Sequence, residues 1–235
     1  MKRYTKRKHK CKSRAVFILL IILLLCVNAG KMQLHSGPIF FSFNSLAHHA
    51  SGEDNGWNLI LVNRDNYIPN DYEVEFTELS NGEKVDSRIY PELQEMFNDA
   101  RAQGYGLFVR EGYRTQEEQQ QLLDEKIEAY KNEGKSTFEA KKLAEQWVAI
   151  PGTSEHQLGI AVDINPDTAK SSSNSVYNWL AKNAHRYGFI KRYPSEKTDI
   201  TGIINEPWHY RYVGKEAASE IYSQGICLEE YAAGL

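Results

Sequence analysis

Histidine and acidic residues form two compact groups in the second half of this 235-residue chain. In the first group, His156 and Asp163 are separated by six residues that include a glycine and an alanine. Because such small residues let the backbone turn closely, a loop histidine and a strand carboxylate can face one point. In the second group, Glu206 stands three residues before His209. Both groups are flanked by apolar residues typical of strands.

These residue types are suited to zinc. Imidazole nitrogens and carboxylate oxygens bind Zn²⁺ at about 2.0–2.2 Å, and three protein ligands leave a fourth position for water, as a catalytic site requires. His156, Asp163 and His209 supply such a set, and Glu206 is the carboxylate to place beside that water. A single His–Asp spacing of this kind is more often an ordinary hydrogen-bonded pair. The combination favours a metal, because ionisable groups inside apolar strands are costly without partners.

The N-terminal segment predicts export. Residues 1–14 contain eight Lys or Arg and no acid, and residues 15–27 are apolar apart from the thiol of Cys26. A basic stretch followed by an apolar one is typical of a secretory signal, here with a cleavage site at residues 27–29. The apolar run is short of the about 20 residues of a full span, but an uncleaved anchor is the alternative. A lipoprotein signal and a buried core helix fit less well. Both favoured interpretations place residues 31–235 outside the cytoplasm.

Composition and charge exclude several classes of protein. With 41% hydrophobic and 25% charged residues, the chain is not collagen-like, disordered or a multi-spanning membrane protein. Beyond residue 14, 20 basic residues stand against 31 acidic ones. This acidic balance argues against nucleic acid as a partner, because phosphate binding needs a basic surface. Cys227 is the only cysteine after residue 26, so the sequence predicts no internal disulfide there.

Hydrophobic spacing and capping signals predict an α+β domain. Helices are expected at residues 90–103, 115–134, 137–148, 176–187 and 215–223. Strands are expected at residues 57–62, 107–109, 159–164, 189–190 and 208–213, with a turn at 63–66. Thr115 and Glu118 form a capping-box pattern. Because helices and strands are mixed without strict alternation, we expect one α+β domain at residues 57–235. A tether at residues 31–56 and the signal or anchor at residues 1–30 precede it.

Three motifs give the chain a resemblance to a known family. The pattern Ser-x-His-x-x-Gly-x-Ala-x-Asp is matched by residues 154–163, Glu-x-x-His by residues 206–209, and Gly-Tyr-Arg by residues 112–114. In this order the motifs resemble the zinc D,D-carboxypeptidases of the VanY type. These share a fold with VanX dipeptidases and L,D-carboxypeptidases. The resemblance covers about residues 57–235 and departs at Glu111, where family members often carry a small residue.

The resemblance implies a fold and a set of roles. The fold would be hedgehog/D-Ala-D-Ala-peptidase-like, with a small antiparallel sheet flanked by helices. His156, Asp163 and His209 would hold Zn²⁺, and Glu206 would act as general base. Arg114 would stabilise the developing oxyanion or bind the terminal carboxylate of the substrate, and the sequence leaves both roles open.

Three more residues are expected to contact the substrate. Ser154 and Gln119 match positions that hydrogen-bond the peptide in the family, and Trp208 is expected as a pocket wall. Each has a structural alternative. Ser154 could be a turn hydroxyl that orients its own loop, Gln119 a solvated helix residue, and Trp208 a core residue.

The implied function is removal of the terminal D-Ala from peptidoglycan stems or lipid-linked precursors that end in D-Ala-D-Ala. Such an activity would contribute to glycopeptide (vancomycin) resistance or to wall maturation. Two alternatives stay open: an L,D-carboxypeptidase acting on tetrapeptide stems, and a zinc-holding module that binds wall peptide without cleaving it. A binding module would be expected to lack Glu206 or Arg114, so catalysis is favoured. A serine enzyme is excluded, because neither Gly-x-Ser-x-Gly nor Ser-x-x-Lys occurs.

Overall fold

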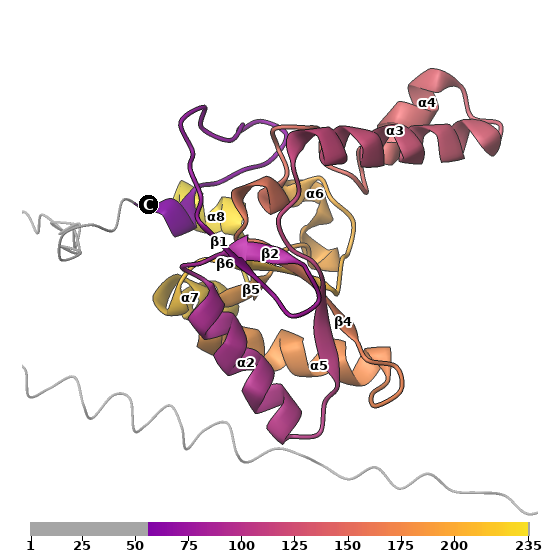
Figure 1. Ribbon diagram of the computed structural model, residues 1–235. Coiled ribbons are helices and arrows are strands. Elements are labelled where there is room, and N and C mark those ends of the chain that lie inside the picture. The colour runs from indigo at the N-terminus through magenta and orange to yellow at the C-terminus, as the bar shows by residue number, and fades with distance from the viewer. Residues whose placement is uncertain (1–55, 235) are drawn as a thin grey trace, which may run out of the picture. The chain divides into compact units, whose positions relative to one another are not determined.

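The computed structural model describes residues 56–234, in which a mixed arrangement of helices surrounds a small sheet (Figure 1). The expected signal or anchor at residues 1–30 and nearly all of the expected tether at 31–56 lie outside these residues. Within residues 56–234, no helix is both long enough and apolar enough to cross a bilayer.

Four antiparallel strands form the main sheet, in the order β3-β4-β6-β5. Their bounds are Leu107–Glu111 for β3, Ala161–Pro166 for β4, His209–Tyr212 for β6 and Phe189–Lys191 for β5. The register places Asp163 of β4 opposite His209 of β6, and Glu111 of β3 on the other side of Asp163. The expectation of an α+β fold with a small antiparallel sheet is therefore confirmed.

The helices of residues 56–234 include the five that periodicity predicts and two short ones that it does not. Their bounds are Tyr90–Ala102 for α2, Gln116–Asn132 for α3, Thr137–Ala144 for α4, Ser173–Asn183 for α5, Thr198–Thr201 for α6, Lys215–Gln224 for α7 and Leu228–Ala233 for α8. Thr115 caps α3 and forms the expected capping box with Glu118. Helices α3 and α4 pack together as a hairpin that projects from the sheet (Figure 1).

The main core lies between the sheet and helices α2 and α5. The apolar stripe of α2 faces this core, and all four of its residues are buried, namely Leu93, Met96, Phe97 and Ala100. From the sheet, Ile164 and Phe189 are fully buried in the same cluster. Burial of one such side chain contributes about 1.5–3 kcal/mol, so this cluster fixes the sheet against the helices.

A second, two-stranded sheet was not predicted. Strands β1 (Phe76–Glu78) and β2 (Lys84–Asp86) form an antiparallel hairpin. The backbone of β2 is bonded to two loops: the carbonyl of Lys84 accepts from the N–H of Tyr113 at 2.6 Å, and the N–H of Asp86 donates to Gly159 at 2.8 Å. Strands of three residues are too short to show the alternation that a sequence prediction needs.

The prediction of a strand at residues 57–62 is wrong. Trp57–Leu59 form a 3₁₀-helix, η1, and the following residues are extended without a partner strand. The carbonyls of Asn58 and Ile60 accept hydrogen bonds from the guanidinium of Arg211 at 3.1 and 2.9 Å. A buried arginine thus provides hydrogen bonds to the backbone carbonyls of this apolar segment. Periodicity alone would assign the segment to a sheet.

Several helix boundaries also differ from the prediction. The helix expected to reach residue 148 ends at Ala144, and the one expected to reach residue 187 ends at Asn183 and continues as a 3₁₀-helix, η3 (Ala184–Tyr187). The short helices α6 and α8 were not expected at all. Helix ends are decided by local hydrogen bonding as well as by hydrophobic spacing, which explains such differences of a turn.

Candidate active site

The sheet register and one short loop bring three potential metal ligands together. His156, Asp163 and His209 each offer a ligand atom, and these atoms lie within 4.8 Å of one another. Oδ1 of Asp163 lies 3.4 Å from Nε2 of His156 and 3.1 Å from Nδ1 of His209. The two imidazole rings stand at 90° to each other. The structure therefore gathers the three residues that the sequence analysis proposed as ligands.

Asp163 and His209 meet because they are opposite residues of neighbouring strands. His156 arrives from the 3₁₀-helix η2 (Glu155–Leu158), which follows Ser154 and ends at Gly159. Gly159 has a φ of 71°, a left-handed conformation that a side chain would strain. The fixed glycine of the first motif thus turns the chain from η2 into β4.

The ring of His156 is oriented by a backbone carbonyl. Its Nδ1 donates to the carbonyl of Gly112 at 2.7 Å, which leaves Nε2 facing Asp163. A Cβ at Gly112 would lie 2.2 Å from the carbonyl oxygen of Lys84, so only glycine fits. The glycine of the Gly-Tyr-Arg motif therefore orients His156 and also allows the close packing at the end of its own strand, β3. Such partners commonly fix the orientation of a histidine ligand.

The electrostatics of the cluster favour a cation among these side chains. Burial would raise the pKa of Asp163, but the adjacent imidazoles of His156 and His209 hold that pKa well below its usual range. Burial lowers the pKa of His209, but the adjacent carboxylates of Asp163, Glu155 and Glu206 outweigh it and raise this pKa to about 9.

The residues present fit a zinc ion. Ligand atoms at about 2.0–2.2 Å from a tetrahedral zinc lie roughly 3.3 Å apart, close to the 3.4 and 3.1 Å seen here. Oδ1 of Asp163 is buried, and it has no hydrogen-bond partner among the residues that the structure describes. A buried carboxylate oxygen of this kind is costly unless something binds it. The donor set of two imidazoles and one carboxylate is one that zinc prefers.

Glu206 lies beside the three potential ligands. One of its carboxylate oxygens is 3.6 Å from Nδ1 of His209, and the residue is 8% exposed. Its backbone N–H donates to the carbonyl of Tyr193 at 3.1 Å, which ties its loop to the end of β5. Burial raises the pKa of Glu206 to about 7, although His209 and Arg114 oppose the shift.

Arg114 is held on both sides by side chains. Its Nε donates to Glu111 at 2.5 Å, and its Nη1 donates to Oε1 of Gln119 at 2.6 Å. Nε2 of Gln119 in turn donates to the carbonyl of Ala149 at 2.7 Å. Gln119 is 1% exposed, so it is not a solvated helix residue. Glu111, which departs from the family pattern, forms a direct ion pair with Arg114.

A pocket of about 410 Å³ opens at this cluster. Ser154 and Trp208, the remaining residues proposed from the sequence, both line it together with Glu206 and Arg114. Ser154 is buried and Trp208 is half-buried. All eight proposed site residues therefore lie at one pocket.

Two residues at the site were missed from the sequence. Glu111 was noted only as a departure from the family, and Glu155 was not considered. Glu155 is fully buried, with one carboxylate oxygen 3.5 Å from Nε2 of His209. Its position directly before the motif histidine was the available signal, but a glutamate next to a ligand is equally typical of a solvated loop.

Comparison with known proteins identifies the family. The family model for VanY, D-alanyl-D-alanine carboxypeptidase, matches residues 82–215. A D-alanyl-D-alanine carboxypeptidase of Enterococcus faecalis is 59% identical over 180 residues, which cover 77% of this chain and 67% of that protein. The chain therefore belongs to the VanY family of D-alanyl-D-alanine carboxypeptidases, as the three motifs predicted.

Solved structures agree with this assignment. A vancomycin-resistance D,D-pentapeptidase VanY mutant from a VanB-type cassette, in complex with Zn(II), and VanYB in complex with D-alanine-D-alanine both have a TM-score of 0.74 at 60% identity. They cover 75% of this chain, and 99% and 98% of the two solved chains. The LdcB LD-carboxypeptidase has a TM-score of 0.62 at 34% identity, covering 77% of this chain and 88% of its own.

Proposed function

We propose that this chain is a zinc-dependent D,D-carboxypeptidase that removes the terminal D-Ala from peptidoglycan stems or precursors ending in D-Ala-D-Ala. The observation that carries this proposal is the convergence of a His-Asp-His set, a buried glutamate and a buried arginine in one pocket. Relatives solved with Zn(II) and with D-alanine-D-alanine support the metal and the substrate class. By removing the residue that glycopeptides bind, this activity contributes to vancomycin resistance.

The metal ligands, the glutamate and the arginine have separate roles in the proposed reaction. His156, Asp163 and His209 hold Zn²⁺, which when bound polarises the scissile carbonyl and lowers the pKa of water. Glu206 accepts a proton from the attacking water and donates it to the nitrogen of the departing D-Ala. Arg114 faces the same pocket and neutralises negative charge that develops on the carbonyl oxygen, or binds the terminal carboxylate.

The remaining pocket residues orient the peptide. The Ser154 hydroxyl offers a hydrogen bond near the reacting centre, and Trp208 provides an apolar wall. Gln119 acts on the peptide through Arg114, whose Nη1 donates to Oε1 of Gln119. A peptide held by several such groups reaches the geometry of attack with little further loss of entropy.

The N-terminal segment would deliver this activity to the wall. Residues 1–30 act as a signal or membrane anchor, residues 31–56 as a tether, and residues 57–235 as the catalytic domain. The basic end would remain in the cytoplasm, which places the domain on the outer side of the membrane. There it meets wall stems and lipid-linked precursors.

Metal and inhibitor dependence test this mechanism. The release of D-Ala from a D-Ala-D-Ala stem should disappear after chelation and return when Zn²⁺ is added. Penicillin should have no effect, because no serine is acylated. Inhibition by penicillin at low concentration, or full activity in the chelated protein, would refute the zinc mechanism.

A further inference from the structure

Glu155 and the potential ligand His209 face each other with unused hydrogen-bonding capacity. Oε2 of Glu155 and Nε2 of His209 are 3.5 Å apart. Both atoms are buried, and neither has a hydrogen-bond partner in residues 56–234. Unpaired buried polar atoms are costly, so each is the natural partner of the other. A closer approach of a few tenths of an ångström would complete an ordinary hydrogen bond.

The contact between Glu155 and His209 bears on the tautomer of His209. Nδ1 faces Asp163 at 3.1 Å, so it is the nitrogen available to a metal. Nε2 must then carry the hydrogen, and a carboxylate acceptor at Nε2 fixes both the tautomer and the ring orientation. Glu155 stands where such an acceptor is needed, just as the Gly112 carbonyl stands at Nδ1 of His156.

Two fully buried arginines hold Glu155 in place. Its other oxygen, Oε1, accepts from Nε of Arg192 at 2.7 Å and from Nη1 of Arg211 at 2.9 Å. With Oε1 bound by two guanidinium groups, Oε2 is left to face His209. Buried charges of this kind persist only when they are paired and hydrogen-bonded, so the carboxylate has little freedom to turn away.

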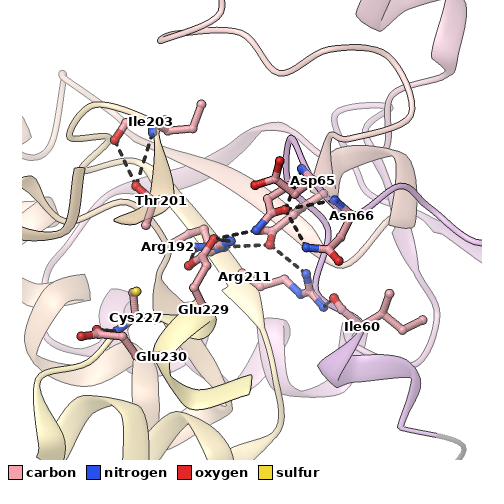
Figure 2. A network of polar contacts seen from close by, with 12 residues as sticks. Ile60, Asp65, Asn66, Arg192, Thr201, Ile203, Arg211, Cys227, Glu229 and Glu230 are labelled. Atoms are coloured by element: carbon pink, nitrogen blue, oxygen red, sulfur yellow. Dashed lines mark hydrogen bonds and ion pairs between the residues drawn. The ribbon is translucent and has the colours of Figure 1, made fainter. Parts of the chain in front are cut away.

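Arg192 extends the network to the C-terminal helix. Its Nη1 and Nη2 donate to the two oxygens of Glu229 in α8 at 2.8 and 2.6 Å, a two-pronged contact that fixes the guanidinium plane. Figure 2 shows Glu229 facing Arg192, with Arg211 directed toward the carbonyl of Ile60. A continuous chain of contacts therefore runs from α8 through Arg192 and Glu155 to His209.

We propose that Glu155 is a positioning residue for His209, and that Glu229 of helix α8 sets the position of Glu155 through Arg192. The proposal rests on the proposed role of His209 as a metal ligand. It assigns to α8 a function in metal affinity, although α8 contributes no residue to the pocket.

Zinc affinity of the full chain tests the proposal, measured by competition with a chromophoric chelator. We expect Glu155→Gln to weaken Zn²⁺ binding about 10–100-fold, as for other carboxylate partners of histidine ligands. Glu229→Gln acts two contacts further away, and we expect a smaller loss of roughly threefold to tenfold. Because Glu155→Gln removes the negative charge that faces two buried guanidinium groups, this variant can fail to fold. In that case Glu229→Gln decides the outcome.

Glu230→Gln is the matched control. Glu230 lies in the same turn of α8 but pairs with Lys197 at 2.8 Å and with the N–H of Cys227, outside the network. It should bind Zn²⁺ within about twofold of the unmodified chain. Co²⁺ can replace Zn²⁺, and its visible absorption reports ligand geometry. This spectrum should change in Glu229→Gln and stay constant in Glu230→Gln, whereas a general loss of α8 stability would act on both.

Two results would overturn the proposal. One is unchanged Zn²⁺ affinity and an unchanged Co²⁺ spectrum in Glu229→Gln and in any folded Glu155→Gln. The other is an equal loss of affinity in Glu229→Gln and Glu230→Gln. If the unmodified chain itself binds no Zn²⁺, the proposed function fails instead, so the two failures can be told apart.

Discussion

Gln119 shows how a single side chain can serve the pocket by holding another. Its Oε1 accepts from Arg114 and its Nε2 donates to Ala149, so both ends of the amide are engaged. Glu111 holds the opposite side of the same guanidinium. The direction of Arg114 toward the pocket is thus set by residues on β3 and α3 together.

Removal of this support should lower catalysis without removing the metal. Gln119→Ala frees one side of Arg114, and displacement of such a group by about 1 Å costs up to roughly 100-fold in rate. We expect kcat/KM to fall about tenfold while zinc content is unchanged. Gln120→Ala is the control, because the Gln120 side chain is exposed and donates to Asp124 of the same helix. Equal activity in the two variants would show that Gln119 does not position Arg114.

Glu206 and His209 should be separable by mutation. Glu206→Ala should keep zinc but lower kcat by about 10²–10⁴-fold, the usual contribution of a general base. His209→Ala should lose both zinc and turnover, because it removes a ligand. Zinc content by elemental analysis and initial rates on the same preparations measure the two effects. Full kcat in Glu206→Ala would mean that the assigned base is wrong.

At this scale the sequence predicted where the site residues lie better than it predicted the residues that support them. The eight proposed residues lie at one pocket, because short motifs fix backbone positions that the strand register then combines. Glu155 was missed because its partners Arg192 and Arg211 are 37 and 56 residues away. A single sequence carries no signal for such distant pairing.

Among the elements, the unpredicted hairpin β1–β2 supports the site. Its Lys84 carbonyl bonds the N–H of Tyr113, directly after the glycine that orients His156, and its Asp86 N–H bonds Gly159. Two of the three motifs are thus held by one hairpin. The sequence suggested neither the hairpin nor this function for it, since both sets of contacts join segments far apart in the chain.

The close packing at Gly112 can be tested by adding one methyl group. Gly112→Ala places a Cβ against backbone, 2.2 Å from the Lys84 oxygen, so the hairpin or the loop must move. We expect a loss of about 1–3 kcal/mol in unfolding free energy, as for other overpacked sites, together with weaker zinc binding. Gly104→Ala is the control: its φ is 88° but no atom lies within 4 Å, so it adds backbone strain alone. Urea unfolding measures stability, and wild-type zinc affinity in Gly112→Ala would contradict this account.

One contact between elements predicts a pH dependence. Tyr187 of η3 donates to Asp99 of α2 at 2.5 Å. Burial and this carboxylate raise the pKa of Tyr187 to about 12. Because the folded-state pKa lies above the unfolded value of about 10, the stabilisation is fully present below pH 10 and is lost as the pH rises toward 12.

Tyr187→Phe isolates this effect, because the other tyrosines are common to both proteins. The variant should lose about 1.5–3 kcal/mol at pH 8, the value of a hydrogen bond to a charged group, and less at pH 11. Urea unfolding at the two pH values measures the difference. An equal loss at pH 8 and pH 11 would show that the hydroxyl does not titrate differently in the folded state.

Element prediction succeeded where a segment's own pattern decides its structure. The stripe of α2 and the capping box of α3 are local signals, and both were confirmed. The segment at residues 57–62 is apolar enough for a strand, but Arg211 takes its carbonyls. Helix α8 is six residues long and is anchored by Glu229 and Glu230, whose partners lie elsewhere in the chain.

At the scale of the whole molecule, the fold gathers three distant motifs at one end of a small sheet. Strands β4 and β6 carry two potential ligands, η2 carries the third, and the loop before β6 carries the buried glutamate. This arrangement supports metal-dependent peptide hydrolysis. The position of the bond that is cut depends on how the pocket receives the end of the stem.

The most direct test therefore measures products. The full-length, zinc-loaded chain would be incubated separately with a pentapeptide stem ending in D-Ala-D-Ala, a tetrapeptide stem and free D-Ala-D-Ala, and the products weighed by mass spectrometry. Our account predicts loss of one alanine from the pentapeptide, no loss from the tetrapeptide, and no loss from any substrate after chelation. Cleavage of the tetrapeptide alone, or no cleavage by the zinc-loaded protein, would contradict the D,D-carboxypeptidase assignment.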